Sequence, residues 1–322
     1  MQHKTTIIDL DTWGVEGESP AIYQREMVIS NNGNSIAVRP MLHDSQHKGH
    51  FGIFVYDTTG KLICSTKNPN GGEQGLAFWP DESHLLMPGH NPTGMKSGKG
   101  PSALKLWRLG NNSFSFPFLD TELHGSGSLT DLQGVSKTGR YVISAYKFYD
   151  THTNTFMDVQ YGNYVFSADD GFVTANQKSD PRYTSSIGGY VLDLIKLKTW
   201  SHIWHGNEFC LTFSPDCRFF VTSEYDSELC IHSTDSPDSV QVIHKQYGEK
   251  DDFYTAAEYK PDSRILFTGS RQGHLYVWDI NNQTCLERIE NAHPYPITQM
   301  KFSATKDELI TTDNERIIVW QL

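Results

Sequence analysis

The residues best suited to chemistry in this sequence are three histidines in one short segment, His43, His47 and His50, with Asp44 beside them. Imidazole nitrogen and carboxylate oxygen are both ligands of zinc. The segment RPMLHDSQHKGH is typical of a loop, and a loop does not fix the spacing of ligands as a helix does. Two interpretations stay open, a metal site and a solvated polar loop that titrates near neutral pH; we favour the second and expect no cofactor.

A second segment, PGHNPTGMKSGKGPS, combines glycines with Lys96 and Lys99, a composition that could hold an anion. It lacks the Gly-Lys-Ser/Thr ending before a helix that a phosphate-binding loop needs, so we interpret it as a flexible connection. Asp169–Gly171 reads Asp-Asp-Gly, but the other calcium ligands are missing. The chain has no GxSxG elbow and no cysteine in a recognisable catalytic setting. We therefore predict no catalytic residue.

Charge and cysteine content restrict the class of partner and the compartment. The formal net charge is −11, which argues against nucleic acid because affinity for it depends on Lys and Arg neutralising phosphates. The five cysteines are widely spread, as expected for free thiols in a reducing compartment. The first residues lack the apolar run of a signal peptide, and no run approaches the roughly 18 apolar residues of a membrane span. We expect a cytoplasmic protein that does not bind membranes.

A strand, a polar turn and a second strand recur seven times along the chain. In three of the turns Pro follows the second residue, and its fixed φ favours a type I turn. The second residue of each recurring turn segment is Ser30, Trp79, Ser136, Ser167, Ser214, Lys260 and Ser303. Third strands such as GIFVYD, ALKLWRL and HLYVWD follow these hairpins. The repeating unit is therefore all-β and hairpin-based.

The segment HLYVWDI (His274–Ile280), together with the Ser-Pro-Asp turns, resembles the WD-repeat family of β-propellers. The resemblance implies one propeller domain over residues 1–322 that serves as an interaction platform. It also implies a buried network in each blade, made by a His before the first strand, an Asp after the second and a Trp in the third.

The repeats depart from this network in three units. The last unit keeps His293 and Trp320 but has Asn314 where the Asp is expected. The fifth keeps Asp226 but has His232 at the Trp position. The sixth keeps Trp278 with Gln272 in place of the Asp. We expect these departures to weaken the network without changing the fold.

The spacing of the hairpins predicts the number of blades. Ser136 and Ser167 lie closer together than the roughly 40 to 45 residues of a WD-type blade. Between Thr130 and Trp204 we place seven strands, with residues 141–148 as a single one. This predicts seven blades with the third lacking its outer strand; the alternative is six blades with an insertion in residues 147–187.

The last unit supplies only three strands before the chain ends at Leu322. The apolar segment TTIIDL, Thr5–Leu10, precedes the first hairpin and has no blade of its own. A propeller protects its strand edges by closing the ring. We therefore expect Thr5–Leu10 to pair as the outer strand of the last blade.

Connections from the second to the third strand of a blade emerge on the same face as those between blades; we call this the loop face. Three of these connections are long, Arg39–His50, Pro88–Ser102 and Gln177–Gly188. Function concentrates on loops held by a rigid scaffold. The residues predicted to bind a partner on this face are His43, His47, His50, Lys96, Lys99, Lys178, Arg182, Tyr183 and Tyr295.

Two classes of function follow. The first is a non-enzymatic scaffold whose loop face and channel mouth bind a protein or peptide, with acidic partners favoured by the local cations and Tyr183 or Tyr295 as the aromatic anchor. The second is a propeller enzyme of the hydrolase or lactonase type, with metal assistance. Converging histidines and carboxylates at the channel mouth would distinguish the enzyme from the scaffold.

Overall fold

The computed structural model describes most of the chain as β-structure. The described residues are 5–9, 22–42, 52–67, 75–90, 102–111, 113–115, 132–144, 147–159, 162–177, 189–195, 198–204, 209–223, 228–236, 240–243, 252–261, 264–303, 305–313 and 315–322. All 28 regular elements in these ranges are strands, so the predicted all-β class is confirmed. In the same ranges there is no helix long and apolar enough to cross a membrane.

The strands form seven antiparallel sheets of four, which are the blades of a propeller. Blade one contains β2 (Ile22–Ile29), β3 (Ser35–Leu42), β4 (Gly52–Asp57) and β5 (Leu62–Lys67). Blade two contains β6 (Ala77–Phe78), β7 (His84–His90), β8 (Ser102–Arg108) and β9 (Ser113–Ser115). Blade three contains β10 (Leu132–Val135), β11 (Tyr141–Ser144), β12 (Lys147–Asp150) and β13 (Thr155–Asp158). Blade four contains β14 (Gly162–Phe166), β15 (Phe172–Gln177), β16 (Gly189–Asp193) and β17 (Lys198–Trp204).

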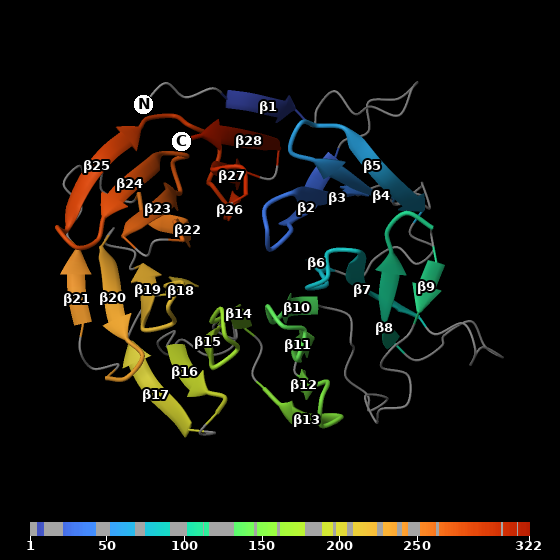
Figure 1. Ribbon diagram of the computed structural model, residues 1–322, viewed down its shortest axis with the longest axis horizontal. Coiled ribbons are helices and arrows are strands. Elements are labelled where there is room, and N and C mark those ends of the chain that lie inside the picture. The colour runs from blue at the N-terminus through green and yellow to red at the C-terminus, as the bar shows by residue number, and fades with distance from the viewer. Residues whose placement is uncertain are drawn as a thin grey trace.

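The remaining three blades complete the ring. Blade five contains β18 (Phe209–Phe213), β19 (Phe219–Ser223), β20 (Leu229–Ser233) and β21 (Val240–Ile243). Blade six contains β22 (Tyr254–Tyr259), β23 (Ile265–Ser270), β24 (Leu275–Asp279) and β25 (Thr284–Ile289). Blade seven contains β26 (Gln299–Ser303), β27 (Glu308–Thr312), β28 (Arg316–Gln321) and β1 (Thr5–Asp9). The first strand of each blade lies nearest the centre, and these inner strands contact one another around the ring (Figure 1). The prediction of seven blades is confirmed.

Blade three differs from the sequence-based expectation. It was predicted to lack its outer strand, and that prediction is wrong, because β13 is present and pairs with β12. The error lies in residues 141–148, which form parts of two antiparallel strands; Ser144 of β11 pairs with Lys147 of β12. The intervening Ala145 and Tyr146 lie outside the described residues, and neither is a residue type that marks a turn. The close spacing of Ser136 and Ser167 reflects this short connection.

The N-terminal strand β1 belongs to the last blade. It pairs antiparallel with β28, with Thr5 opposite Trp320 and Asp9 opposite Arg316. Figure 1 shows β1 lying along β28 on the outside of blade seven. The first and last strands of the chain therefore lie in one sheet, and β1 covers the outer edge of β28.

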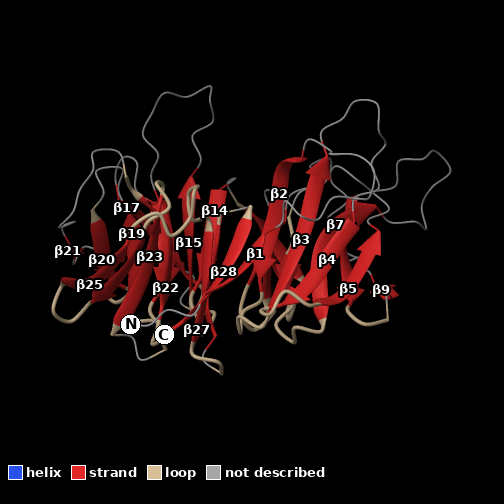
Figure 2. Cartoon of the chain, turned by 90° about the horizontal axis from the view of Figure 1, so that it is seen from above, coloured by secondary structure: helices blue, strands red, loops and turns tan. Residues whose placement is uncertain are grey.

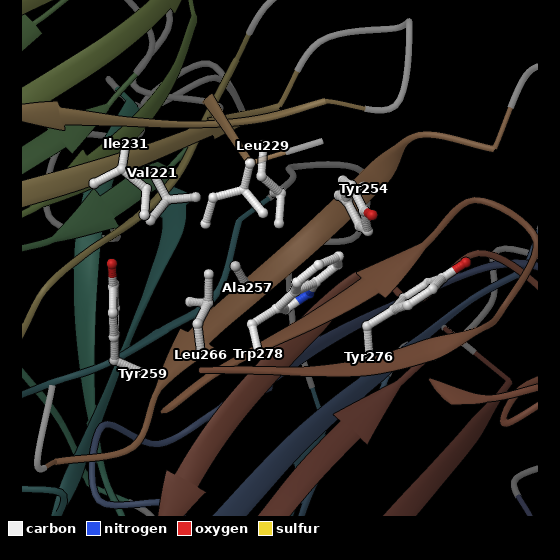
Figure 3. Packing of buried hydrophobic residues seen from close by; sticks show 10 residues of the cluster. Val221, Leu229, Ile231, Tyr254, Ala257, Tyr259, Leu266, Tyr276 and Trp278 are labelled. Carbon is white, nitrogen blue, oxygen red and sulfur yellow. The ribbon is translucent and has the colours of Figure 1, made fainter. Parts of the chain in front are cut away.

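The hydrophobic core lies between the blades. Seven clusters of buried residues each combine side chains from two neighbouring blades, one cluster for every interface of the ring. Between blades five and six, the Trp278 ring is 6.1 Å from that of Tyr254 and 6.0 Å from that of Tyr276 (Figure 3). Because each blade buries both of its faces against neighbours, no blade has a complete core of its own.

The first hairpin turn of each blade lies on the face opposite the loop face, where tan turns line one edge of the ring in Figure 2. In blade one the N–H of Gly33 donates to the carbonyl of Ser30 at 2.9 Å, and Gly33 has φ of 70°. A type I turn followed by a left-handed residue is a common three-residue hairpin connection. The same bond and a positive φ recur at Glu82, Gly139, Asp170 and Cys217.

These turns are also bonded to one another around the ring. Asn32 N–H donates to Glu82 Oε1 at 2.8 Å between blades one and two, and Lys260 Nζ lies 2.9 Å from Asp307 Oδ1 between blades six and seven. Ser303 Oγ donates to Asn34 Oδ1 at 3.3 Å between blades seven and one. This face is therefore built of short, mutually braced turns.

Candidate protein-interaction surface

The structure describes one of the nine residues predicted to bind a partner. Tyr295 lies in the connection between β25 and β26, on the loop face. The other eight lie outside the described residues: His43, His47, His50, Lys96, Lys99, Lys178, Arg182 and Tyr183. Among the residues that the structure does describe, no group of three or more His, Cys, Asp or Glu side chains is placed to hold a metal ion.

Tyr295 is an exposed aromatic residue on a restrained segment. Its side chain is 48% exposed, and Pro294 and Pro296 fix φ on both sides of it. The backbone is anchored at both ends, because the N–H of His293 donates to Gly273 O at 2.9 Å and that of Ile297 to Ser270 O at 3.2 Å. A rigid aromatic side chain loses little conformational entropy on binding, which suits it to anchor a partner.

Gly273 permits this close approach of two loop-face connections. It has φ of +79°, and a Cβ atom at this position would lie 2.0 Å from the carbonyl oxygen of His293 and 2.9 Å from that of Tyr295. Any other residue would push the Tyr295 segment away from the turn between β23 and β24. The turn and the tyrosine segment are therefore held as one unit.

The same turn presents Arg271 beside Phe253, at the entrance to blade six. The Arg271 guanidinium lies 5.5 Å from the centroid of the Phe253 ring, and the N–H of Arg271 donates to Phe253 O at 2.9 Å. Arg271 is exposed, and none of the described carboxylates forms an ion pair with it. A guanidinium placed over an aromatic ring keeps its N–H groups available for a carboxylate. We call Tyr295, Phe253 and Arg271 the blade-six surface.

A buried carboxylate supports the turn that carries Arg271. Asp252 Oδ1 accepts the N–H of Gln272 at 3.0 Å, and the Tyr276 hydroxyl donates to Asp252 Oδ2 at 3.3 Å. Burial, followed by the charge of Asp252, raises the pKa of Tyr276, so the phenol stays protonated. The sequence has Gln272 where the acidic residue of this blade is expected; in the structure Asp252, at the blade entrance, contributes a buried carboxylate to this turn.

The tyrosine segment begins at a second buried network, in blade seven. His293 Nε2 lies 2.7 Å from Thr311 Oγ1, and the Trp320 indole N–H donates to the same oxygen at 2.8 Å. His293 Nδ1 lies 3.2 Å from Asp313 Oδ2 with both side chains fully buried. The network was expected to be weakened by Asn314, which lies outside the described residues. That expectation is wrong, because the neighbouring Asp313 supplies the carboxylate.

Burial alone would raise the pKa of the Asp313 carboxyl. The His293 imidazole and the backbone N–H groups of Arg316 and Glu315 outweigh this effect and hold the pKa below its ordinary value. Asp313 accepts these N–H groups at 2.7 Å and 3.0 Å. An ionised Asp313 therefore fixes both the turn after β27 and the histidine from which the tyrosine segment starts.

Blade five carries the predicted substitution of Trp by His. His232 Nε2 lies 3.0 Å from Thr222 Oγ1, and the imidazole stacks on Phe220 with ring centroids 4.7 Å apart. His232 pairs with Phe220 in the ladder as Trp278 pairs with Leu266, so the two side chains hold equivalent positions. This prediction is confirmed, while Asp226 of the same unit lies outside the described residues.

Phe253 and Arg271 were not among the predicted site residues. Arg271 could have been found from its place in a connection between second and third strands, which the sequence assigns to the loop face. That connection is short, and the prediction gave weight only to long ones. The contact of Arg271 with Phe253 depends on how the two loop-face connections pack together, which local sequence does not encode.

Comparison with known proteins identifies the repeats. The model of the WD domain, G-beta repeat, matches residues 197–233 and 240–279. Pre-mRNA-processing factor 19 of Oryza sativa subsp. japonica is 26% identical over 139 residues, which is 39% of this chain and 26% of the relative. Pre-mRNA-processing factor 19 homolog 2 of Arabidopsis thaliana is 27% identical over 112 residues, 35% of this chain and 21% of the relative. Protein Atg16l2 of Mus musculus is 20% identical over 169 residues, 52% of this chain and 26% of the relative.

The matched regions thus span about a quarter of the length of each of these relatives. Each matched repeat ends with the third strand of a blade, β20 or β24, and the second begins at β21, the outer strand of the blade before. The sequence repeat is therefore offset from the blade by one strand. This offset is the reason that a strand from the other end of the chain, β1, completes blade seven.

Proposed function

Because this chain is a WD-repeat β-propeller, we propose that it is a non-enzymatic scaffold that binds a protein or peptide on its loop face. The observation that carries the proposal is the blade-six surface, where an exposed tyrosine between two prolines lies on the same braced unit as an arginine stacked on phenylalanine. Tyr and Arg are enriched among the residues that dominate binding energy at protein interfaces.

The chemistry of the surface favours an acidic partner. Arg271 offers a planar set of N–H donors that a carboxylate can accept, and Tyr295 offers a rigid apolar ring with a polar tip. The predicted loop residues Lys96, Lys99, Lys178 and Arg182 would add positive charge on the same face of a chain with net charge −11. Such a local contrast orients an incoming acidic partner, since steering depends on how charge is distributed. We place the protein in the cytoplasm and propose neither nucleic acid nor membrane as a ligand.

The test is capture of a partner by the full chain from cells of its source, followed by affinity measurements on variants. Tyr295→Ala and Arg271→Glu should each weaken binding about 30-fold or more, since interface anchors typically contribute more than about 2 kcal/mol. The double change of Lys96 and Lys99 to Glu should mainly slow association and reduce its salt dependence.

Matched controls lie on the opposite face. There Arg218 lies over the ring of Phe219, with 5.8 Å between guanidinium and centroid, in a turn of blade five. Arg218→Glu makes the same change as Arg271→Glu in the same kind of contact, and Phe219→Ala removes an exposed aromatic ring as Tyr295→Ala does. Lys306→Glu changes a charge in a turn of blade seven. These variants should bind as the wild type does. If they weaken binding while Tyr295→Ala and Arg271→Glu do not, the partner binds the opposite face and the proposal is wrong.

A further inference from the structure

The interface between blades one and two, which we call the first seam, is apolar through most of its depth. Ala37, Ile53 and Val55 of blade one pack against Phe78, Leu85, Met87 and Trp107 of blade two. The seam also contains buried polar groups that the apolar cluster cannot satisfy.

Arg39 is the most unusual of these groups. It follows Ala37 by two residues on β3, so its side chain lies on the same side of the strand and faces blade two. The side chain is 3% exposed and is paired with Glu26, directly opposite on β2, through Nη2 alone. Its Nε and Nη1 atoms are buried and have no acceptor among the described residues. A buried charged group with unmet donors is costly unless something accepts them.

A second unsatisfied donor faces the same seam. The Trp107 indole Nε1 is buried without an acceptor in the described part of the chain. In blades six and seven the equivalent indoles of Trp278 and Trp320 donate to Thr268 and Thr311. The register places Met87 of blade two where those blades have threonine, so the hydroxyl is missing.

The surroundings add positive charge and a route of access. Lys105 is also buried, lies opposite Met87 in the ladder and has a partner of its own. Glu26, on the innermost strand of blade one, is 23% exposed, so its pair with Arg39 borders solvent at the inner end of the seam. Arg39 lies three residues from the end of β3 at the loop face. The site can therefore be reached from the mouth of the channel.

We propose that the first seam is a binding site for a carboxylate, with Arg39 as its anchor and Trp107 as a second donor. A carboxylate accepts hydrogen bonds without presenting any N–H or O–H of its own, which is what a surplus of buried donors requires. Its negative charge offsets that of Arg39, whose existing counter-ion is shared with solvent. The carboxylate comes from an acidic side chain of the bound protein, in which case the site rests on the proposed function, or from a small carboxylic acid.

The site can be tested by NMR on the whole protein without any partner. Sodium acetate replaces sodium chloride at constant ionic strength while the Nε–H signal of Arg39 and the indole N–H signal of Trp107 are followed. Both signals should shift and saturate. Three N–H groups that already have acceptors serve as controls, and their signals should not shift. They are the indole N–H groups of Trp278 and Trp320 and the Nε–H of Arg264, which donates to Asp279 at 3.1 Å.

A variant and a second probe complete the experiment. Arg39→Met replaces the guanidinium with an apolar side chain of similar length. It should weaken the affinity for acetate, measured from the shift of the Trp107 signal, by about tenfold or more. If this variant does not fold, the wild-type titration decides. A capped hexaglutamate peptide that saturates at lower concentration than acetate indicates a protein partner, and equal concentrations per carboxylate indicate a small acid. If neither probe produces a saturable shift of the Arg39 and Trp107 signals, the site does not exist, whatever the outcome of partner capture.

Discussion

Thr311 is the residue at which the buried network of blade seven converges. Its hydroxyl oxygen accepts the Trp320 indole N–H and lies 2.7 Å from His293 Nε2. In blade six the equivalent Thr268 accepts the Trp278 indole N–H. Thr311→Val leaves two buried partners unsatisfied and should lower the free energy of unfolding by about 2 to 4 kcal/mol, against about 1 to 2 kcal/mol for Thr268→Val. Urea unfolding with an unchanged slope measures both values. Equal losses would show that the His293 contact contributes nothing.

Asp313 makes the stability of the protein depend on pH in a predictable direction. Because its pKa is lowered in the folded state, its contribution is fully present above the ordinary pKa of about 4 and is lost as the pH falls through the lowered value. The Asp313→Asn variant should therefore have a lower free energy of unfolding than the wild type, by a constant amount from about pH 5 to about pH 7. This difference should narrow below about pH 4. Thermal unfolding across this range gives the comparison, and a gap that widens in acid contradicts the assignment.

At the scale of elements, regular hairpins were predictable and the short connections between strands were not. Turns such as that from Ser214 to Cys217 carry Pro and Asp at positions where these residues favour a turn, so their strands were located correctly. The connection between β11 and β12 contains no such residue. Its two strands read as one apolar run, and only their pairing, Ile143 with Phe148, separates them.

The blade-six surface illustrates the same limit. Tyr295 could be singled out from its two prolines and its place between blades. Its partners in space, Phe253 and Arg271, come from different connections, which meet because Gly273 lets the chain segments approach. The carboxylate that accepts the N–H of Gln272 in blade six likewise comes from Asp252, twenty positions earlier in the chain. Sequence spacing carries no signal for contacts that depend on the packing of two turns.

At the scale of the whole molecule, the ring depends on β1. Deleting residues 1–12 removes the outer strand of blade seven and leaves the edge of β28 unpaired. The core is shared between blades, so opening one should destabilise the whole ring. We expect the melting temperature to fall by at least about 5 °C, which corresponds to roughly 3 kcal/mol in a chain of this size.

Deletion of residues 1–4 is the matched control, because it shortens the same terminus and leaves β1 in place. It should melt within about 1 to 2 °C of the full chain. If the two truncated proteins melt together, β1 contributes little to closure, and blade seven is stable with three strands.

The sequence by itself determined the class of fold and the number of blades, because period-two apolar runs and turn residues are local features that repeat seven times. It also predicted that the apolar segment Thr5–Leu10, which has no blade of its own, pairs in the last blade, where β1 lies beside β28. The tertiary structure alone decided which polar groups meet. Asp313 with His293, Arg271 with Phe253, and the unmatched donors of Arg39 and Trp107 each depend on how separate segments pack, and such contacts leave no periodic pattern along the chain.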